Sequence, residues 1–362
     1  MLKLHVIQAA FGDALLIEYG QVPKFILIDG GPRDIFDESL RPEIDRIIGN
    51  GELEALIISH VDMDHIKGIL DLLTELKRQT DAEEDHFIKI KDLWLNNFNK
   101  TIDKDGEIQP KLKEVHSAAA SAFVQMNGVA VALQGVEEGF KVTRLAGILQ
   151  IPVNTPAPGG IFTVDTIQDD IVFGELAFSI VGPTQANLDA LKKDWLEWLK
   201  KRAIDIAKGK FDVLAMSDRS VPNLSSLMFL VKDGEKSILF TGDGRGDHLL
   251  QGLKMKGLLD DGRMHVNIFK VPHHGSDRNS NRELFENITA DTYVISANGK
   301  NGNPDTATLI WIVESAKTEG RTIRIVVTNE TPTTKKLIAD YPPADWGYTI
   351  DYIPNGKNSI TL

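Results

Sequence analysis

Hydrophobic residues follow two different periods along the chain, and each period predicts one type of element. Stretches in which every second residue is apolar, and short apolar runs bounded by turn residues, predict β-strands. Stretches in which apolar residues recur at every third or fourth position predict helices with one buried face. The predicted strands cover residues 2–8, 14–19, 25–28, 53–58, 87–95, 176–181, 227–231, 238–240, 266–271, 293–296 and 323–327. The predicted helices cover residues 43–48, 64–78, 184–207, 249–259 and 308–317.

Strands flanked by helices occur in both halves of the chain. This arrangement predicts two sheets packed face to face with helices outside them. The stretch 101–146 differs, because it begins as a polar loop and continues as an Ala-rich helical segment over 115–133. Residues 147–172 are rich in Pro and Gly, which argues against a long element there. We therefore predict a single domain over 1–362 with a helical insertion over 101–146.

Composition and charge limit the chemistry and the partners that the protein can have. The 362 residues include 52 acidic and 40 basic side chains, for a net charge of −12. An acidic surface repels nucleic acid and anionic membranes, so a phosphate-bearing substrate has to be held by a local positive patch or a bound metal. The absence of cysteine excludes disulfides, thiolate catalysis and Cys-ligated metals. No apolar run is long enough to cross a membrane, and no signal-peptide pattern begins the chain. We expect a cytoplasmic protein without a membrane partner.

The most informative segment runs from Ser59 to His65, at the end of a buried strand and the start of a helix. Four of its residues, His60, Asp62, Asp64 and His65, are potential metal ligands. Neighbouring carboxylates repel each other, and a cation bound between them removes that repulsion. Capping of the helix N-terminus is the plain alternative, and it accounts for one or two Asp residues. It does not account for two His residues at this spacing.

Two later strand ends carry further potential metal ligands. An apolar strand ends in Gly242-Asp243-Gly244, and a carboxylate at a strand end can bridge two cations. Another strand ends in the pair His273 and His274, followed by a glycine that allows a turn. If strand geometry continued through this pair, the two imidazoles would face opposite ways. Taken alone, each segment is also compatible with an ordinary turn.

Taken together, these segments resemble the metallo-β-lactamase-fold hydrolase superfamily, and specifically its ComEC-like branch. The resemblance runs through nearly the whole chain in order. It rests on Gly12-Asp13, Asp29-Gly30-Gly31, the His-x-Asp-x-Asp-His of residues 60–65, Asn223-Leu224-Ser225-Ser226, Thr241-Gly242-Asp243 and Pro272-His273-His274-Gly275-Ser276. It implies an α+β fold, an αββα sandwich of two mixed sheets flanked by helices.

The resemblance also implies a two-metal site and a role for each matching residue. His60 and Asp62 would hold the first ion, and Asp64, His65 and His274 the second. Asp243 would bridge both ions, and Asp29 would orient a ligand histidine from behind. Asp64 and His273 are the implied catalytic residues, with His273 binding phosphate or protonating the leaving group. The implied second-shell or substrate residues are Asn223, Ser276 and Asn303.

Two departures from the family pattern concern this site. Many members have a further His ligand after the strand that here ends at Gly182, so the first ion has fewer protein ligands. Asn303 stands where related sequences often carry His, and an amide cannot act as an acid. An oxygen-rich ligand set without thiolates predicts two divalent metal ions, either zinc or manganese.

The function implied is a metal-dependent hydrolase, a phosphodiesterase or nuclease that uses a metal-bound hydroxide. Its partner would be a phosphodiester substrate, with nucleic acid as one candidate. The alternatives are a hydrolase of a small phosphodiester metabolite, or a weakly active metal-binding module in a larger assembly, such as a bacterial defence system. The lysine-rich segment 192–210, with Trp195 and Trp198, is either an amphipathic helix with a solvated face or a phosphate-tracking patch.

Overall fold

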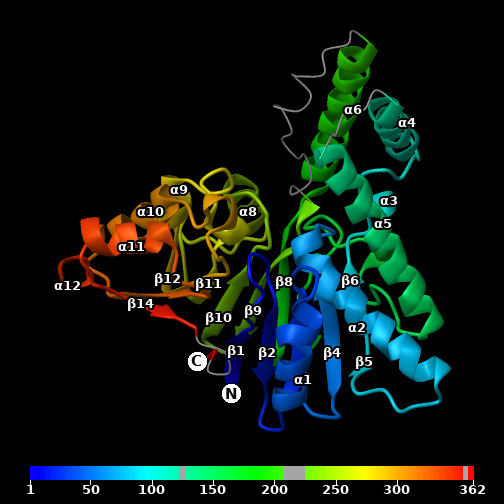
Figure 1. Ribbon diagram of the computed structural model, residues 1–362. Helices are drawn as coiled ribbons and strands as arrows, with labels where there is room; N and C mark the ends of the chain where they lie inside the picture. Colours follow the sequence, from blue (N-terminus) through cyan, green and yellow to red (C-terminus); the bar gives the residue numbers. More distant parts are fainter. Residues whose placement is uncertain (122–126, 208–224, 354–357) are drawn as a thin grey trace.

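The chain folds into two β-sheets that face each other, with helices on both outer sides (Figure 1). The computed structural model describes residues 1–121, 127–207, 225–353 and 358–362. The first sheet has the strand order β15-β1-β2-β3-β4-β5, and β6 also pairs with β4. Its strands are β1 (Leu2–Val6), β2 (Leu15–Tyr19), β3 (Lys24–Ile28), β4 (Glu52–Ile58), β5 (Lys89–Ile90), β6 (Leu93–Leu95) and β15 (Ser359–Thr361).

The second sheet has the order β14-β13-β12-β11-β10-β9-β8-β7. Both sheets are mixed. In the second sheet, β10 to β14 run parallel and β7 to β10 run antiparallel. In the first sheet, β3 to β6 run parallel, and β15, β1, β2 and β3 run antiparallel. The strands of the second sheet are β7 (Ile171–Phe173), β8 (Leu176–Gly182), β9 (Met228–Asp233), β10 (Lys236–Phe240), β11 (Met264–Lys270), β12 (Ile288–Ile295), β13 (Ile323–Val327) and β14 (Tyr348–Tyr352).

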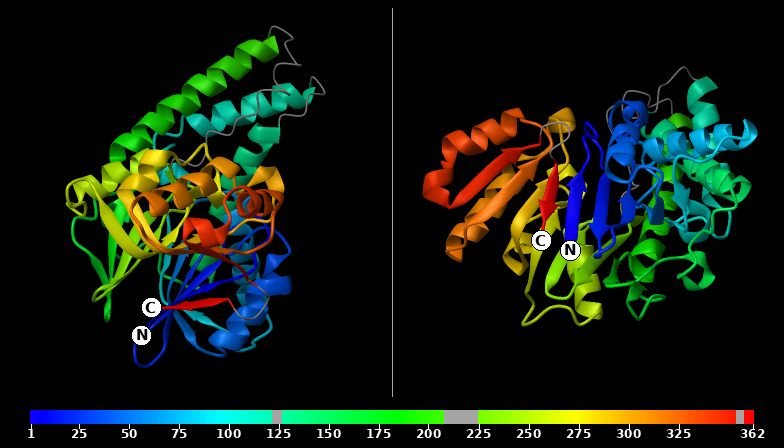
Figure 2. Two further views of the ribbon diagram at one scale, coloured as in Figure 1. Left: turned by 90° about the vertical axis from the view of Figure 1, so that its left-hand side faces the viewer. Right: turned by 90° about the horizontal axis from the view of Figure 1, so that it is seen from below.

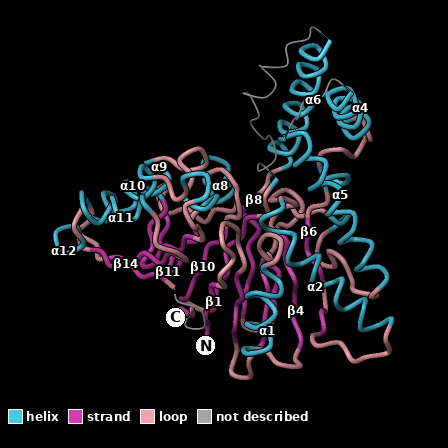
Figure 3. The backbone as a smooth tube through the Cα atoms, in the orientation of Figure 1, coloured by secondary structure: helices cyan, strands magenta, loops and turns pink. Residues whose placement is uncertain are grey.

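The helices separate into two outer layers and a projecting group (Figures 1 and 3). Helices α1, α2 and α5 cover the first sheet, and α8 to α11 cover the second. Helices α4 and α6 pack against each other and extend beyond the sandwich (Figure 2). The helices are α1 (Arg41–Ile47), α2 (Met63–Asp81), α3 (Phe98–Thr101), α4 (Ile108–Ser121), α5 (Asn127–Ile148), α6 (Gln185–Ala207), α8 (Gly246–Met255), α9 (Arg282–Asn287), α10 (Thr306–Thr318), α11 (Pro332–Asp340) and α12 (Pro343–Trp346).

Apolar side chains form one core between the sheets and one beneath each helical layer. Alternation along β1 directs Leu2, Leu4 and Val6 into the central core, where they meet Phe178 and Phe229 of the second sheet. The central strands are buried on both faces, which is why they read as continuous apolar runs. The four layers, helix, sheet, sheet, helix, confirm the predicted α+β sandwich of two mixed sheets, and they are consistent with a metallo-β-lactamase-type fold.

Some predicted elements differ from those in the structure. The predicted strand 87–95 is two short strands, β5 and β6, both paired with β4. The backbone stays hydrogen-bonded to β4 between them, since Leu56 N–H donates to the carbonyl of Asp92 at 2.9 Å. The buried Asp92 carboxylate accepts hydrogen bonds from Trp94 Nε1 and the backbone N–H of Thr155. The stretch predicted as a helix over 115–133 overlaps both α4 and α5, and residues 122–126 lie outside the described part.

No helix in the described ranges combines the length and the apolar character needed to cross a membrane.

The loop after β3 and helix α2 approach each other so closely that both need glycine. A Cβ atom added at Gly68 would lie 1.9 Å from the carbonyl oxygen of Gly30. The backbone N–H of Gly68 also donates to the carbonyl of Gly31, at 3.1 Å. This contact fixes the start of α2 against the loop that contains Asp29.

We expect the Gly68→Ala variant to lose about 1–3 kcal/mol of unfolding free energy, because backbone atoms have to move apart. The loss outweighs the gain of about 1 kcal/mol that Ala brings to a helix interior. Urea denaturation measures the change. The matched control is Gly147→Ala in α5, where a Cβ atom would meet nothing within 4 Å. Equal stability of the Gly68→Ala variant and the wild type would show that α2 does not sit against this loop.

Candidate metal centre

The predicted ligands meet where loops from both sheets converge. His60 follows β4 and Asp243 follows β10, whereas His273 and His274 follow β11. Asp29 follows β3, the parallel neighbour of β4. Residues far apart in the sequence therefore share one site because the strands that precede them end at the same place.

Asp243 lies at the centre of this cluster, 1 % exposed. Its Oδ2 lies 3.5 Å from His60 Nε2 and 3.4 Å from His273 Nε2. Its Oδ1 lies 3.3 Å from His65 Nε2 and 3.6 Å from His274 Nε2. Each carboxylate oxygen therefore faces two imidazole nitrogens.

These separations fit a cation better than they fit direct hydrogen bonds. The Nε2 atoms of His60, His65 and His274 are buried without a hydrogen-bond partner. Two ligand atoms that each lie about 2.1 Å from one ion at a tetrahedral angle are about 3.4 Å apart. The ligand atoms of two sets, His60-His65-Asp243 and Asp64-His65-His274, all lie within 4.8 Å of one another. The described residues thus fit a metal site.

Asp62 does not serve as the helix cap that the plain alternative required. It occupies the N-cap position of α2, but its side chain makes no capping hydrogen bond. Its Oδ2 instead lies 3.7 Å from His60 Nε2, and Asp64 Oδ2 lies 3.4 Å from His274 Nε2. Both carboxylates therefore face the histidines of the cluster.

Asp29 contacts His65 at Nδ1, the ring nitrogen that does not face Asp243. Its Oδ2 lies 2.8 Å from His65 Nδ1 and accepts a hydrogen bond from Ser59 Oγ at 2.6 Å. Its Oδ1 accepts from the backbone N–H of Ser59 at 2.7 Å. A carboxylate against Nδ1 fixes the ring so that Nε2 points toward Asp243.

The two adjacent histidines have different environments, although not for the reason expected. Strand β11 ends at Lys270, and His273, His274 and Gly275 all have positive φ, from 46° to 82°. The alternation of a strand therefore does not apply to this pair. His274 is buried and its Nδ1 donates to the carbonyl of Ser296 at 2.9 Å, whereas the side chain of His273 is 28 % exposed.

Asn279, which the sequence analysis did not single out, fixes the orientation of His273. Its Nδ2 donates to the carbonyl of Asp243 at 2.7 Å, so its Oδ1 is the atom that faces His273. That oxygen lies 2.8 Å from His273 Nδ1 and can only accept. His273 Nδ1 therefore carries a proton, and its Nε2 faces Asp243.

The remaining predicted residues lie around this cluster or outside the described part. Ser276 is buried, and its backbone N–H donates to the carbonyl of His273 at 2.9 Å. Asn303 lies in the loop whose Pro304 contacts Gly275. Asn223 falls outside the described residues. At Gly182, an added Cβ atom would lie 2.1 Å from Met228 Cε, so Met228 fills the space of a ligand side chain there.

Sequence reasoning also left two charged residues without a role. Asp13 and Lys270 are each 1 % exposed, and Lys270 Nζ lies 2.7 Å from Asp13 Oδ2. Asp13 belongs to the quoted Gly12-Asp13 motif, which was the only available signal. Lys270 ends a strand that also contains His265 and Asn267, so a polar residue at this position carries no signal of its own.

Helix α5 packs directly onto the loop that contains His60 and Asp62. A Cβ atom at Gly135 would lie 2.8 Å from the carbonyl oxygen of Val61, between His60 and Asp62. Lys67 of α2 also pairs with Glu138 of α5, with 3.3 Å between nitrogen and oxygen, and both side chains are buried. The predicted insertion thus supports the loop that carries two of the candidate ligands.

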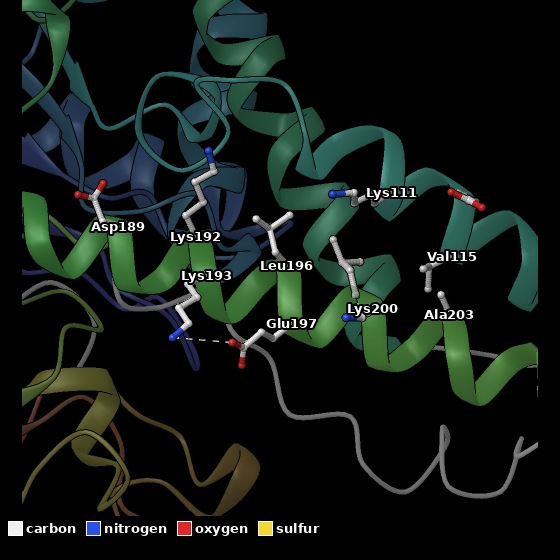
Figure 4. Close-up of a pocket in the computed structure, with 11 residues that line it drawn as sticks. Lys111, Val115, Asp189, Lys192, Lys193, Leu196, Glu197, Lys200 and Ala203 are labelled. Carbon is white, nitrogen blue, oxygen red and sulfur yellow. Dashed lines mark ion pairs between the residues drawn. The ribbon is translucent and has the colours of Figure 1, made fainter.

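The part of the lysine-rich segment that lies in α6 forms one wall of a groove between α4 and α6 (Figure 4). The groove has a volume of about 570 Å³, and its lining includes Lys111, Lys192, Lys193 and Lys200 around Leu196. Lys192 pairs with Asp105, and Lys193 Nζ lies 3.9 Å from Glu197 Oε1.

Of the two tryptophans in this segment, Trp195 is buried and Trp198 is half-buried. Trp195 is 2 % exposed and its ring packs edge-on against Trp198, with 5.6 Å between centroids. A buried ring is not available to stack on a base. Lys208 and Lys210 lie outside the described residues.

Burial and charge together determine the protonation of the metal-free cluster. Burial lowers the pKa of His65, but the Asp243 and Asp29 carboxylates outweigh burial and raise this pKa well above its usual value. Burial raises the pKa of Asp243, but the surrounding histidines hold it well below its usual value. The pKa of Asp62 is raised, by burial and by the nearby Asp64 and Asp243. Protons on the histidines thus balance the buried carboxylates when no ion is bound.

No family model and no curated protein matches this chain. Among solved structures, the chain is similar to one described as a new diphosphatase from the PhnP family. The two share 10 % sequence identity and superpose with a TM-score of 0.40, over 100 % of this chain and 98 % of the other. At this level of similarity, the site geometry has to carry the functional argument.

We expect metal binding to release protons near pH 7. A ligand imidazole has to be neutral, and the raised pKa of His65 keeps it protonated until the ion displaces the proton. The metal affinity should therefore rise with pH above the ordinary imidazole pKa of about 6.5 and continue to rise until the raised pKa of His65 is passed. Titration calorimetry with zinc or manganese in two buffers of different ionisation enthalpy measures the proton release. Binding without proton release at pH 7, or weaker binding at higher pH, would contradict this protonation scheme.

Proposed function

We propose that this protein is a metal-dependent phosphodiesterase of the metallo-β-lactamase fold, related to the ComEC-like branch. The observation that carries the proposal is the position of Asp243. Each of its two buried carboxylate oxygens faces two imidazole nitrogens at 3.3–3.6 Å. A carboxylate with ligand histidines on both sides is suited to bridge two divalent ions, zinc or manganese.

The ligands divide into two sets. His60, Asp62 and Asp243 would hold the first ion, and Asp64, His65, His274 and Asp243 would hold the second. Two bound divalent ions lower the pKa of water and neutralise the charge that develops on a phosphate. We expect the first ion to be held more weakly, because Gly182 supplies no ligand and Met228 fills that space.

His273 has the position of a general acid. It is the most exposed of the four histidines around Asp243, and Asn279 holds its Nδ1. Its Nε2, 3.4 Å from Asp243 Oδ2, is the atom that would donate a proton to the oxygen of the leaving group. The proton is then recovered from water. Asn303 cannot share this task, because an amide does not release a proton.

The structure bears on the choice between a polymer and a small diester. The acidic net charge, the burial of Trp195 and the ion pairs of Lys192 and Lys193 favour a small phosphodiester as the second candidate. Lys111 and Lys200 in the groove between α4 and α6 favour a polymer such as DNA or RNA. The two candidates share the same reaction centre and differ only in what holds the rest of the substrate.

Hydrolysis assays with metal-reconstituted protein test the proposal. Single-stranded DNA, RNA and bis(p-nitrophenyl) phosphate are compared with zinc and with manganese. Cleavage of either polymer supports a nuclease, and cleavage of only the small diester supports the second candidate. Metal binding without any hydrolysis would contradict the proposed function and favour a binding module in a larger assembly.

We expect different consequences when the two adjacent histidines are replaced. The His274→Ala variant should lose metal and turnover, because His274 is a ligand of the second ion. The His273→Ala variant should keep its metal but lose about 10²–10⁴-fold in rate, the usual contribution of a positioned acid. That loss should be smaller for p-nitrophenyl esters, whose leaving group needs no proton. Metal analysis and steady-state kinetics measure both effects.

His265→Ala is the matched control, because His265 lies at the other end of β11 and pairs with Asp291. It should bind metal and turn over substrate as the wild type does. If His273→Ala loses metal and His274→Ala does not, the two roles are exchanged. If neither variant loses metal, the histidine pair is not part of a metal centre.

A further inference from the structure

A buried ion pair lies directly behind the proposed second metal site. Lys270 is the last residue of β11 in the second sheet, and Asp13 precedes β2 in the first sheet. Both side chains are 1 % exposed, and 2.7 Å separate Nζ from Oδ2. The pair therefore joins the two sheets beneath the cluster of histidines.

Asp13 reaches two of the proposed ligand histidines from the side opposite Asp243. Its Oδ1 lies 3.7 Å from His274 Nδ1, and its Oδ2 lies 4.0 Å from His65 Nδ1. The Oδ1 atom is buried without a hydrogen-bond partner. Ligand atoms of Asp13, Asp243 and His274 also lie within 4.8 Å of one another. By position and chemistry, Asp13 is a further candidate ligand.

The Asp13 carboxylate, however, forms an ion pair with Lys270. Its ammonium also donates to the carbonyl of Val271 at 3.2 Å, which fixes it in place. A buried ion pair is weak evidence for stability, since apolar residues of similar volume often replace one without loss. Behind the proposed second metal site, however, the fixed positive charge of Lys270 reduces the net negative charge that attracts divalent ions.

We propose that Asp13 and Lys270 are positioning residues that set the charge and the ligand set of the metal centre. Lys270 acts as a built-in cation that neutralises Asp13 and withholds it from the ions. The second ion is then held by Asp64, His65, His274 and Asp243 alone. This inference rests on the metal centre of the proposed function, but it does not depend on which substrate is hydrolysed.

The proposal predicts effects of opposite sign on metal affinity. Asp13→Asn leaves an unpaired ammonium beside the ions, so the affinity for manganese should fall by at least about tenfold. Lys270→Met leaves an unpaired carboxylate that can bind an ion, so the affinity should rise by a similar factor or a further ion should bind. The double variant Asp13→Asn/Lys270→Met removes both charges and should return close to the wild-type affinity.

Calorimetric titration of each full-length variant with manganese, together with metal stoichiometry, measures these effects without any turnover. If Lys270→Met does not fold, Lys270→Gln removes the charge with a different side chain, and the double variant removes both charges together. Lys3→Met is the matched control, because Lys3 pairs with Glu18 at 3.1 Å at a different part of the first sheet. It should leave the metal affinity unchanged.

Weaker binding in both single variants, without recovery in the double variant, would show a purely structural pair and overturn the proposal. Unchanged affinity in all variants would overturn it as well. A wild-type protein that binds no metal overturns both this inference and the proposed function. A wild-type protein that binds two ions but hydrolyses nothing overturns only the proposed function.

Discussion

The burial of the Asp243 carboxylate among four imidazoles is the constraint on which the architecture of the site depends. A carboxylate that is 1 % exposed is strongly destabilising unless positive charge surrounds it. His60, His65 and His274, whose pKa values the nearby carboxylates raise against the effect of burial, supply that charge as protonated groups, and a divalent ion would supply it in the proposed metal centre. The strand ends around Asp243 therefore have to converge to within a few ångströms, because charge at longer range would not compensate its burial.

The sandwich meets this requirement by linking the site to the central core. Strands β4, β10 and β11 each place apolar side chains in the core between the sheets, and a candidate ligand follows each of them, so this core sets the relative position of His60, Asp243 and His274. Close backbone contacts then fix the loops. Gly275 turns with a φ of 82° against Pro304, and Gly68 of α2 meets Gly30. The pair of Asp13 and Lys270 ties the two sheets together at the same point.

Much of this arrangement could be predicted from the sequence, because it depends on local patterns. The central strands are continuous apolar runs, and the motif of residues 60–65 places four potential ligands within six positions. The edge strands β7, β14 and β15 escaped prediction because they are short and only partly buried. Asn279 and Lys270 escaped it because their roles arise from contacts across the fold. An Asn in a loop and a Lys at a strand end are ordinary residues until the partner is known.

The most direct test of a two-metal centre around Asp243 is anomalous X-ray diffraction from crystals of the manganese-loaded protein. We expect two anomalous peaks, one within bonding distance of each carboxylate oxygen of Asp243. His60 should lie beside the first peak, and His65 and His274 beside the second. A single peak at the second position would still place the ion on Asp243, but it would contradict a bridging carboxylate. Peaks only at other carboxylates, or none at all, would contradict the metal centre itself.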